Sequence, residues 1–576
     1  MKKIYALISL LLIAFILFTA CDTSSDIEDE DNADNEDNEE KQTEDKKESS
    51  SDNPSNPNKE TNKETNKKPI QESKPSGIQG DNENPNEIFT DKDVSEDYEE
   101  DKSVEILLNG DTVSCESEFV TVDGSTITIT SGGTYIVSGT LNDGSIIVNT
   151  GLEDKPQIVL KNANITSKTS AAIYVAQAKK VFITLDDGTQ NKLSNGGEFA
   201  ASDPNIDAAL FSKDDIVLNG SGVLTVNSPV GHGISAKDDL IFSGGSYAII
   251  AALRGVDANN SISINNSAIN ISSGKDGMKA EHLEDVTKGY VYIQSGNIKI
   301  TAKGDGISAS SFVEIDNVNL EISTNSSDEL ISLKGIKAKT DIILNNGIYN
   351  LSCKDDTLHA DNSVNIYGGD LKLASQDDAL NGKNLVYISD GEIKVSTAKD
   401  GITSKDIEIS GGKINLTVTN DAIAAEGFDL NGNPADNATL LISDGEIFVD
   451  AIGDCIQVKG DLFIEGGETF LHASPETGSQ IIKFTGEGKI TGGTIVALGS
   501  SQLPTLPDSS NGVINKNFSS KAKGTMVILE DINKTEIFNL NSKYNFSVIY
   551  ISSDIFVKNS KCYLTIGSST VTCTTK

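Results

Sequence analysis

Several residue types are scarce in this chain of 576 residues, and each scarcity argues against a class of function. Tryptophan is absent, which argues against a flat aromatic platform for crystalline cellulose, although exposed tyrosines could still stack on sugar. The four histidines are scattered, and none has a serine or cysteine partner suggested by the sequence, so His-dependent catalysis is not expected. The six cysteines show no spacing typical of a zinc site.

Positive charge is scarce as well. The formal net charge is −39, and Arg254 is the only arginine of the chain. Because binding to phosphates needs a basic surface, this charge excludes nucleic acid as a partner.

One apolar run lies at the N-terminus, where Lys2 and Lys3 precede it and Cys21 follows it. Residues 1–20 are too short for a comfortable membrane span and have the form of a secretory signal. A cysteine after a small residue at the end of such a run resembles a bacterial lipobox, in which the cysteine is diacylated. Phe18 departs from the usual leucine of that motif, and an ordinary signal peptide or an uncleaved anchor is the alternative.

Residues 21–101 consist mainly of Asp, Glu, Asn, Ser, Lys and Pro, with almost no apolar residues. Such a segment cannot bury enough apolar surface to offset its chain entropy, so we expect it to be disordered. At about 80 residues it would span roughly 50 Å as a random coil. The sequence therefore predicts an acidic tether that holds the folded part away from a membrane; an acidic docking tail is the alternative.

The folded part is organised around a repeat that runs without a gap from residue 341 to residue 426. Its steps are 22, 22 and 21 residues, as read from Ile342, Val364, Val386 and Ile407. Each unit holds two short alternating apolar runs that are separated by a glycine turn. A unit of this size must stack on its neighbours to bury its apolar face, which predicts an all-β, right-handed parallel β-helix with coils of about 22 residues.

A column of aspartates accompanies the apolar columns, just after the second strand of each coil. The expected members are Asp276, Asp305, Asp328, Asp356, Asp378, Asp400, Asp421 and Asp454. Rungs about 4.8 Å apart place a cation about 2.4 Å from two stacked carboxylates, a distance that suits calcium and not magnesium. Neighbouring charged pairs would otherwise repel by roughly 3 kcal/mol at an effective dielectric near 20. The column therefore predicts Ca²⁺ between rungs, and the alternative is that each Asp caps its own turn.

Two insertions interrupt the repeat, at residues 281–289 and 426–438, and inserted loops of a solenoid often carry its ligands. The first insertion is acidic and offers a second candidate calcium site formed by Glu281, Glu284 and Asp285. Tandem Lys-Asp-Asp elements also recur, at residues 213–215 and 237–239, without an assigned role.

The coils are expected to span residues 102–499, and several short strands then predict a small β cap over residues 500–576. Cys562 and Cys573 are close enough in sequence to pair as a hairpin disulfide, which an extracytoplasmic location permits. Cys353 and Cys455 fall in different coils and are expected to be buried thiols.

Several motifs together resemble one known family. They are FSKDD followed by VLNGSGVLTV, SAKDDL followed by SGG, KDGMKAE before KGYVYI, and the terminal GGTIVALGSS. The chain resembles, from about Ser103 to about Thr570, a family of bacterial secreted or lipid-anchored carbohydrate-binding proteins. The resemblance implies a pectate-lyase-like right-handed β-helix that binds cellulose or acidic pectic polymers, with calcium along the helix. Arg254 departs from the pattern, because it stands where other coils carry Asp.

Two functions from different classes follow. The first is a monomeric, non-catalytic, calcium-dependent polysaccharide-binding lipoprotein, anchored to the membrane at the cell surface through its lipid and specific for plant cell-wall polymers. A calcium bridge would let an acidic protein hold an anionic polymer. The second is a calcium-dependent polysaccharide lyase, for which Arg254 is the one candidate base; its alternative role is pairing with acids such as Asp257. A structural surface adhesin is a third hypothesis.

Overall fold

The computed structural model describes residues 88–200, 204–328, 330–428, 434–476, 478–500 and 505–576. Helix in these ranges is confined to α2 (Asp91–Val94) and one 3-10 turn (Glu100–Lys102), and the other elements are strands. The predicted all-β class is therefore confirmed. No helix within the described ranges is long and apolar enough to cross a membrane. The predicted signal peptide and Cys21 lie outside the described residues.

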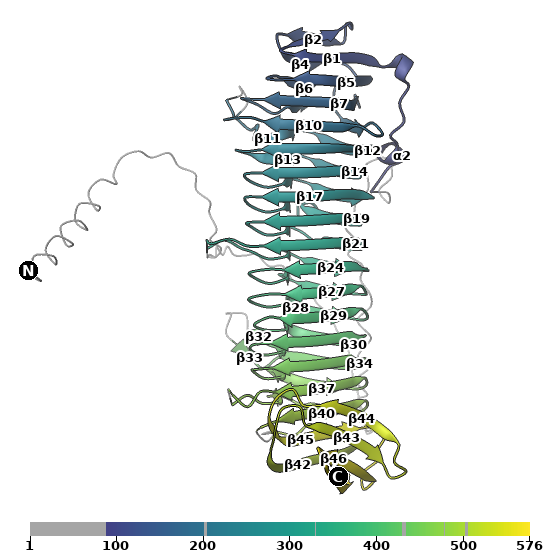
Figure 1. Cartoon of the computed structure of the whole chain (residues 1–576), viewed down its shortest axis with the longest axis vertical. Coiled ribbons are helices and arrows are strands. Elements are labelled where there is room, and N and C mark those ends of the chain that lie inside the picture. Colours follow the sequence, from purple (N-terminus) through teal and green to yellow (C-terminus); the bar gives the residue numbers. More distant parts are fainter. Residues whose placement is uncertain (1–87, 201–203, 329, 429–433, 477, 501–504) are drawn as a thin grey trace, which may run out of the picture. The chain divides into compact units, whose positions relative to one another are not determined.

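Most strands pair in parallel with a strand one coil further along the chain, and the pairs form three ladders (Figure 1). The first ladder consists of β1 (Val104–Gly110), β5 (Thr134–Leu141), β7 (Gln157–Ser167), β9 (Lys180–Leu185), β12 (Asp215–Ser228), β14 (Asp239–Ala251), β16 (Ser261–Asn265), β19 (Tyr290–Ala302), β21 (Val313–Thr324), β23 (Asp341–Leu344), β26 (Ser363–Ile366), β28 (Leu380–Ile388), β30 (Ile402–Val418), β34 (Ala438–Ala451), β36 (Gly460–Ile464), β39 (Gly488–Ile490) and β41 (Asp508–Ser509). The second ladder adds β10 (Gln190–Asn195), β17 (Ser267–Ser273), β24 (Gly347–Ser352), β27 (Asp370–Ala374), β29 (Glu392–Thr397), β37 (Glu468–Ala473) and β40 (Thr494–Gly499), and shares β7, β12, β14, β19, β21, β30 and β34. The third ladder consists of β4 (Thr126–Ile129), β6 (Ser145–Asn149), β8 (Ile173–Gln177), β11 (Ala208–Ser212), β13 (His232–Ala236), β15 (Val256–Ala258), β18 (Met278–Ala280), β20 (Ile307–Ala309), β22 (Ile336–Ala338), β25 (Leu358–Ala360), parts of β28 and β30, β31 (Ile423–Ala425), β35 (Ile456–Val458) and β38 (Ile482–Phe484).

The inner faces of the three ladders share one apolar core. Along each strand every second residue points inward, as at Val364 and Ile366 of β26 and at Leu371 and Leu373 of β27, all of which are buried. Stacking continues this core from coil to coil, because no single coil could enclose it.

A glycine with positive φ stands where the first ladder turns into the second. Gly347, Gly369, Gly391 and Gly412 have φ values of 134°, 105°, 111° and 85°. A Cβ on Gly369 would lie 2.9 Å from the carbonyl oxygen of Gly347 in the preceding coil. Glycine recurs here because both the backbone conformation and the close approach of stacked turns exclude a side chain.

The N-terminal coils begin with two antiparallel pairs, β1 with β2 (Thr112–Cys115) and β3 (Val120–Asp123) with β4. Ahead of them, residues 88–102, which we call the strap, pack on the outer face of the first ladder, where Phe89 contacts an apolar cluster. The prediction of a disordered tether through residue 101 is therefore wrong for residues 88–101. The prediction rested on the average composition of the segment. Its few apolar residues, however, pack on a surface of the coils, and composition does not reveal that contact. Residues 21–87 of the predicted tether lie outside the described residues.

Antiparallel strands follow the last coils. β45 (Phe546–Ser553) pairs with β40 on one side and with β42 (Gly512–Lys521) on the other. Four further strands form a separate antiparallel sheet in the order β44 (Glu536–Asn541), β43 (Met526–Asp531), β46 (Lys561–Ile566) and β47 (Ser569–Thr574). A second apolar cluster joins residues of this region to the outward-facing Phe470, Val496 and Leu498 of β37 and β40. The second insertion carries a short hairpin of β32 (Gly427–Phe428) and β33 (Pro434–Ala435).

Candidate functional site

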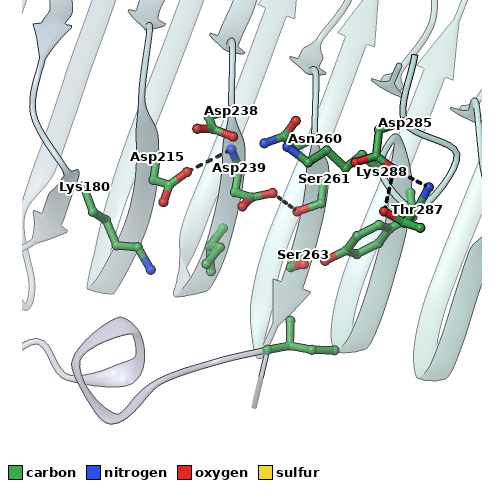
Figure 2. A pocket seen from close by; sticks show the side chains of 13 residues that line it. Lys180, Asp215, Asp238, Asp239, Asn260, Ser261, Ser263, Asp285, Thr287 and Lys288 are labelled. Carbon is green, nitrogen blue, oxygen red and sulfur yellow. Dashed lines mark hydrogen bonds between the residues drawn. The ribbon is translucent and has the colours of Figure 1, made fainter. Parts of the chain in front are cut away.

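A pocket of about 270 Å³ lies on the outer face of the first ladder, where β12, β14, β16 and β19 adjoin the first insertion (Figure 2). Three parts of the chain build it: the ladder, the loop of residues 281–289, and the strap. Its lining residues are Ile88, Lys180, Asp215, Asp238, Asp239, Ile241, Asn260, Ser261, Ser263, Asp285, Thr287, Lys288 and Tyr290.

The floor of the pocket is one column of outward-facing residues. Parallel register places Lys180, Asp215, Asp239, Ser261 and Tyr290 on successive rungs. Side chains two residues apart in a strand share a face, so Ile241 and Ser263 form the next column. The column is joined from rung to rung, because Asp215 Oδ1 accepts the amide hydrogen of Asp239 at 3.2 Å. The hydroxyl of Ser261 then donates to Asp239 Oδ1 at 2.7 Å.

Asp215, Asp238 and Asp239, which we call the acid trio, each offer an oxygen within 4.8 Å of the other two (Figure 2). Burial, together with the charges of Asp239 and Asp238, raises the pKa of Asp215 to about 7. Burial and the charge of Asp239 likewise raise the pKa of Asp238 to about 6. At neutral pH the trio therefore favours a bound proton or a bound cation over three bare carboxylates.

Two lysines border the trio. Lys180 stands one rung before Asp215, and its Nζ lies 3.4 Å from Asp93 of the strap in a buried ion pair. Lys288 enters from the inserted loop, whose fold is fixed where the hydroxyl and amide of Thr287 donate to Asp285 at 2.6 and 3.0 Å. These two hydrogen bonds lower the pKa of Asp285, which therefore stays charged beside the pocket. The site thus presents both carboxylates and ammonium groups.

The predicted aspartate column lies elsewhere, at the corner between the second and third ladders. Backbone hydrogen bonds align one residue per coil, and we call this set the corner column. Its members are His232, Arg254, Asp276, Asp305, Lys334, Asp356, Asp378, Asp400, Asp421, Asp454 and Gln480. Seven of the eight predicted aspartates occupy it, and Arg254 stands in it as the sequence indicated.

Most side chains of the corner column accept the backbone N–H of the next member, with donor–acceptor distances between 2.6 and 3.3 Å. The accepting residues are His232, Asp276, Asp305, Asp356, Asp400, Asp421 and Asp454. This contact explains why an acceptor recurs in register: it satisfies an amide at a corner where the strand ladders are interrupted. The alternative of a capping role is thus supported for six of the seven aspartates, with the difference that each of these six caps the next coil and not its own turn.

The second oxygen of each aspartate also has a protein partner, 2.7 to 3.9 Å away. The pairs are Asp276 with Arg254, Asp305 with Lys337, Asp356 with His359, Asp378 with Asn381, Asp400 with Lys399, Asp421 with Gln457, and Asp454 with Lys483. The positive charge that the column needs is therefore supplied partly by its own neighbours. These contacts do not test the calcium that the sequence predicts between these rungs.

Asp378 differs from the rest of the column. Its Oδ1 is buried and has no hydrogen-bond partner among the described residues. Burial, with the charges of Asp356, Asp400 and Asp377, raises its pKa to about 7. Nearby, Asp355, Asp356 and Asp377 bring oxygens within 4.8 Å of one another. This second group already holds an internal cation, because Lys334 pairs with both Asp355 and Asp356.

Three other predicted site residues, Asp328, Glu281 and Glu284, lie neither in the pocket nor in the corner column. Asp328 lies exposed in a loop, and Lys334 occupies the position in the corner column that was expected for Asp328. The assignment of Asp328 to that column is therefore wrong. The motif spacing failed there because a loop separates β21 from β22. In the acidic insertion only Asp285 lines the pocket, whereas Glu281 pairs with Lys279 at 2.9 Å and Glu284 is exposed.

Arg254 is held by Asp257 at 3.1 Å and by Asp276 at 3.5 Å, as its alternative role required. Burial works to lower its pKa, but the carboxylates of Asp257 and Asp276 outweigh burial and raise it. A proton-abstracting base must first lose its own proton, so these contacts oppose that role.

Cys562 and Cys573 lie directly opposite each other on β46 and β47. Both are buried free thiols in the structure, so their disulfide stays a prediction that the pairing makes sterically reasonable. Cys353 and Cys455 are buried free thiols, as predicted.

The acid trio was missed as a metal site by sequence reasoning. Its signal is the pair of Lys-Asp-Asp elements, which end at Asp215 and Asp239, 24 residues apart. In register these aspartates are neighbours, but the pocket around them depends on the inserted loop and the strap. Neither of those contacts follows from a repeat pattern.

A β-rich chain with an outward-facing pocket of carboxylates, amides and hydroxyls fits the class of sugar-binding proteins. This chain belongs to the family described as "Carbohydrate-binding domain-containing protein", which matches residues 123–379 and 374–528. A protein of that description from Acetivibrio thermocellus is 37% identical over 232 residues, which are 40% of this chain and 81% of the relative. A solved structure, described as the polysaccharide lyase-like protein from C. thermocellum in a gadolinium derivative, is 35% identical. It covers 43% of this chain and 97% of its own, with a TM-score of 0.38.

Proposed function

We propose that this protein binds an anionic polysaccharide through calcium, without cleaving it, and that the acid trio is the calcium site. The observation that carries this proposal is the clustering of Asp215, Asp238 and Asp239 in a pocket of a carbohydrate-binding family member. The raised pKa values of Asp215 and Asp238 give the physical reason, since a divalent cation would relieve the repulsion that raises them.

The residues present fit calcium. Ca²⁺ takes six to eight oxygen ligands from carboxylates, carbonyls and water. The trio supplies carboxylate oxygens, and Asn260 and Ser261 add neutral oxygens to the same pocket. Bound there, the ion would supply a positive bridge between these carboxylates and the acidic groups of a sugar polymer.

Charge explains why a bridge is needed. The chain carries a net charge of −39, so an acidic polymer would be repelled from most of its surface. Lys288 offsets part of that repulsion at the pocket, and its ammonium group is suited to a uronate carboxylate, whereas the ammonium group of Lys180 is paired with Asp93. We therefore favour polymers rich in uronic acid, such as pectic polymers of plant cell walls, over neutral cellulose.

The remaining features of the proposal concern topology. We propose that the three ladders form a right-handed parallel β-helix and that the protein works as a monomer. We also propose that export and acylation at Cys21 display it on the cell surface, with residues 21–87 as the tether. The order of apolar run, cysteine and acidic segment in the sequence supports this arrangement.

Affinity electrophoresis through gels that contain polygalacturonate tests the function. Calcium should retard the parent protein, chelator should abolish the retardation, and Asp239→Asn should lose it. Asp370→Asn is the matched control, because Asp370 is a partly exposed strand residue paired with Lys372 and lies far along the ladder. Equal retardation of Asp239→Asn and the parent would refute the trio as the calcium site.

A second measurement separates the trio from the corner column. Isothermal titration with calcium should show fewer ions for Asp215→Asn with Asp239→Asn than for the parent. The same measurement on Asp378→Asn with Asp400→Asn should give an unchanged stoichiometry. A loss confined to the second double variant would return the calcium to the corner column that the sequence indicated.

The lyase alternative keeps one test. Incubation with polygalacturonate and calcium should yield no unsaturated product that absorbs in the ultraviolet. A rise in absorbance that disappears in Arg254→Ala would establish the lyase.

A further inference from the structure

The strap and the pocket occupy the same outer face of the first ladder. In Figure 1, α2 lies beside β12 and β14, and the chain continues from it towards β1. Ile88, at the beginning of the strap, lines the pocket. The strap is therefore one wall of the proposed binding site.

Apolar contacts hold the pocket end of the strap. Phe89 packs against the cluster of Phe182, Val217 and Ile241, which are outward-facing and buried beneath it. Its ring centroid also lies 6.2 Å from that of Tyr292. Without the strap, these side chains would face water.

Polar contacts continue along the strap. The side-chain amide of Asn219 donates to the carbonyl oxygens of Asp93 and Ser95 at 3.2 and 2.9 Å. Further along, the hydroxyl of Tyr98 donates to Asp186 at 2.8 Å. The two bonds from Asn219 recognise the strap backbone and the bond from Tyr98 fixes a strap side chain, so the segment is bound in one register.

Asp93 links the strap to the charges of the pocket. It is completely buried, and its carboxylate faces Lys180, whose side chain is 6% exposed. Thr90 fixes this arrangement through a capping box, in which each side chain accepts the backbone N–H of the other residue. Lys180 in turn is the rung neighbour of Asp215, and its charge opposes the rise in the pKa of Asp215 that burial causes.

We propose that Asp93 is a positioning residue of the binding site, which holds the ammonium group of Lys180 on the strap side and keeps it from neutralising the acid trio. The inference rests on the proposed function, because it takes the trio as the cation site. When the strap is docked, Asp93 balances Lys180, and the trio keeps its charge for a divalent cation. When the strap leaves, Lys180 loses this partner, and Asp215 on the neighbouring rung, whose pKa the charge of Lys180 already works to lower, is a carboxylate that the freed ammonium group can approach.

Docking of the strap and binding of the cation are then coupled, and the coupling is reciprocal. Loss of Asp93 weakens calcium binding, and calcium in turn holds the strap in place. We expect Asp93→Asn to raise the Kd for calcium about tenfold, within the usual range of such couplings. The segment that leads to the proposed membrane tether would thus report whether the site is loaded.

Calcium titration of full-length variants tests the positioning role. The matched control is Asp91→Asn, which removes the same charge from an exposed position two residues away and should leave the Kd unchanged. The decisive variant is Asp93→Asn with Lys180→Met. If Asp93 acts through Lys180, the double variant binds calcium as tightly as Lys180→Met alone. A further loss in the double variant would show that Asp93 acts only through its overall charge, which overturns the proposal.

Hydrogen exchange supplies a readout that needs no ligand assay. Calcium should slow exchange of the strap amides in the parent, and this slowing should be absent in Asp239→Asn. Asn219→Ala loosens the strap without changing any charge and should also weaken calcium binding, which keeps the test valid if Asp93→Asn folds poorly. If the parent protein binds calcium at the trio but the exchange rates of its strap amides do not change, the coupling alone is refuted. If Asp239→Asn binds calcium as tightly as the parent protein does, the proposed function is refuted instead.

Discussion

Replacing Asp378 by Asn should stabilise the protein at alkaline pH. The native carboxylate is buried, one of its oxygens has no hydrogen-bond partner among the described residues, and Asp356 and Asp400 lie on the neighbouring rungs. Folding raises the pKa of Asp378 from 3.8 to about 7, mainly through burial and then through these charges. Asparagine keeps the size of the side chain and removes the charge that causes the cost.

The direction of the pH dependence follows from that shift. Because the folded state holds the proton more tightly than the unfolded chain does, stability falls as pH rises from about 4 to about 7. A shift of about three units corresponds to about 4 kcal/mol as an upper limit, and local relaxation reduces it. We expect Asp378→Asn to gain about 1 to 3 kcal/mol at pH 8 and little at pH 4.

Denaturant unfolding in chelator at pH 4 and pH 8, followed by circular dichroism, measures this difference. Asp370→Asn is the matched control, since Asp370 forms a partly exposed ion pair with Lys372 at 2.9 Å, and removing it should cost at most about 1 kcal/mol at either pH. If Asp378→Asn destabilises the protein at pH 8, or changes the free energy of unfolding by the same amount at both pH values, the carboxylate is not a destabilising buried charge.

Three further changes have definite expected outcomes. Cys21→Ser should release the protein from the membrane or leave it unprocessed, and fractionation with unchanged retention and processing would refute acylation. Lys334→Met should lower the free energy of unfolding by about 3 kcal/mol, because it leaves the carboxylates of Asp355 and Asp356 without their buried partner. A free energy of unfolding within about 0.5 kcal/mol of the parent value, measured by denaturant titration, would contradict this. Gly369→Ala should cost about 2 kcal/mol by the same assay, since its φ is 105°, and an unchanged midpoint would mean that the turn relaxes freely.

The repeat made most of the coil architecture predictable. A step of about 22 residues, with Gly369 and its equivalents at each turn, requires stacked strands, and the structure has them. The strap could not be predicted in this way, because Phe89 and Asp93 contact residues that are more than 80 positions away in sequence. The pocket was missed for the same reason, since three separate segments must meet before a cavity exists.

The two groups of acids show why position in a column does not identify a metal site. In the corner column, Asp421 gives one oxygen to the amide of Asp454 and the other to Gln457, so the chain itself occupies the carboxylate. In the acid trio, oxygens of Asp215 and Asp239 also meet protein donors, but these side chains line a pocket that a ligand can enter. Repulsion between stacked carboxylates can be relieved by neighbouring protein donors and cationic side chains or by a bound ion, and the corner column has such donors and side chains. A cation is therefore best accommodated where carboxylates converge on open space, and that place is the pocket beneath the strap.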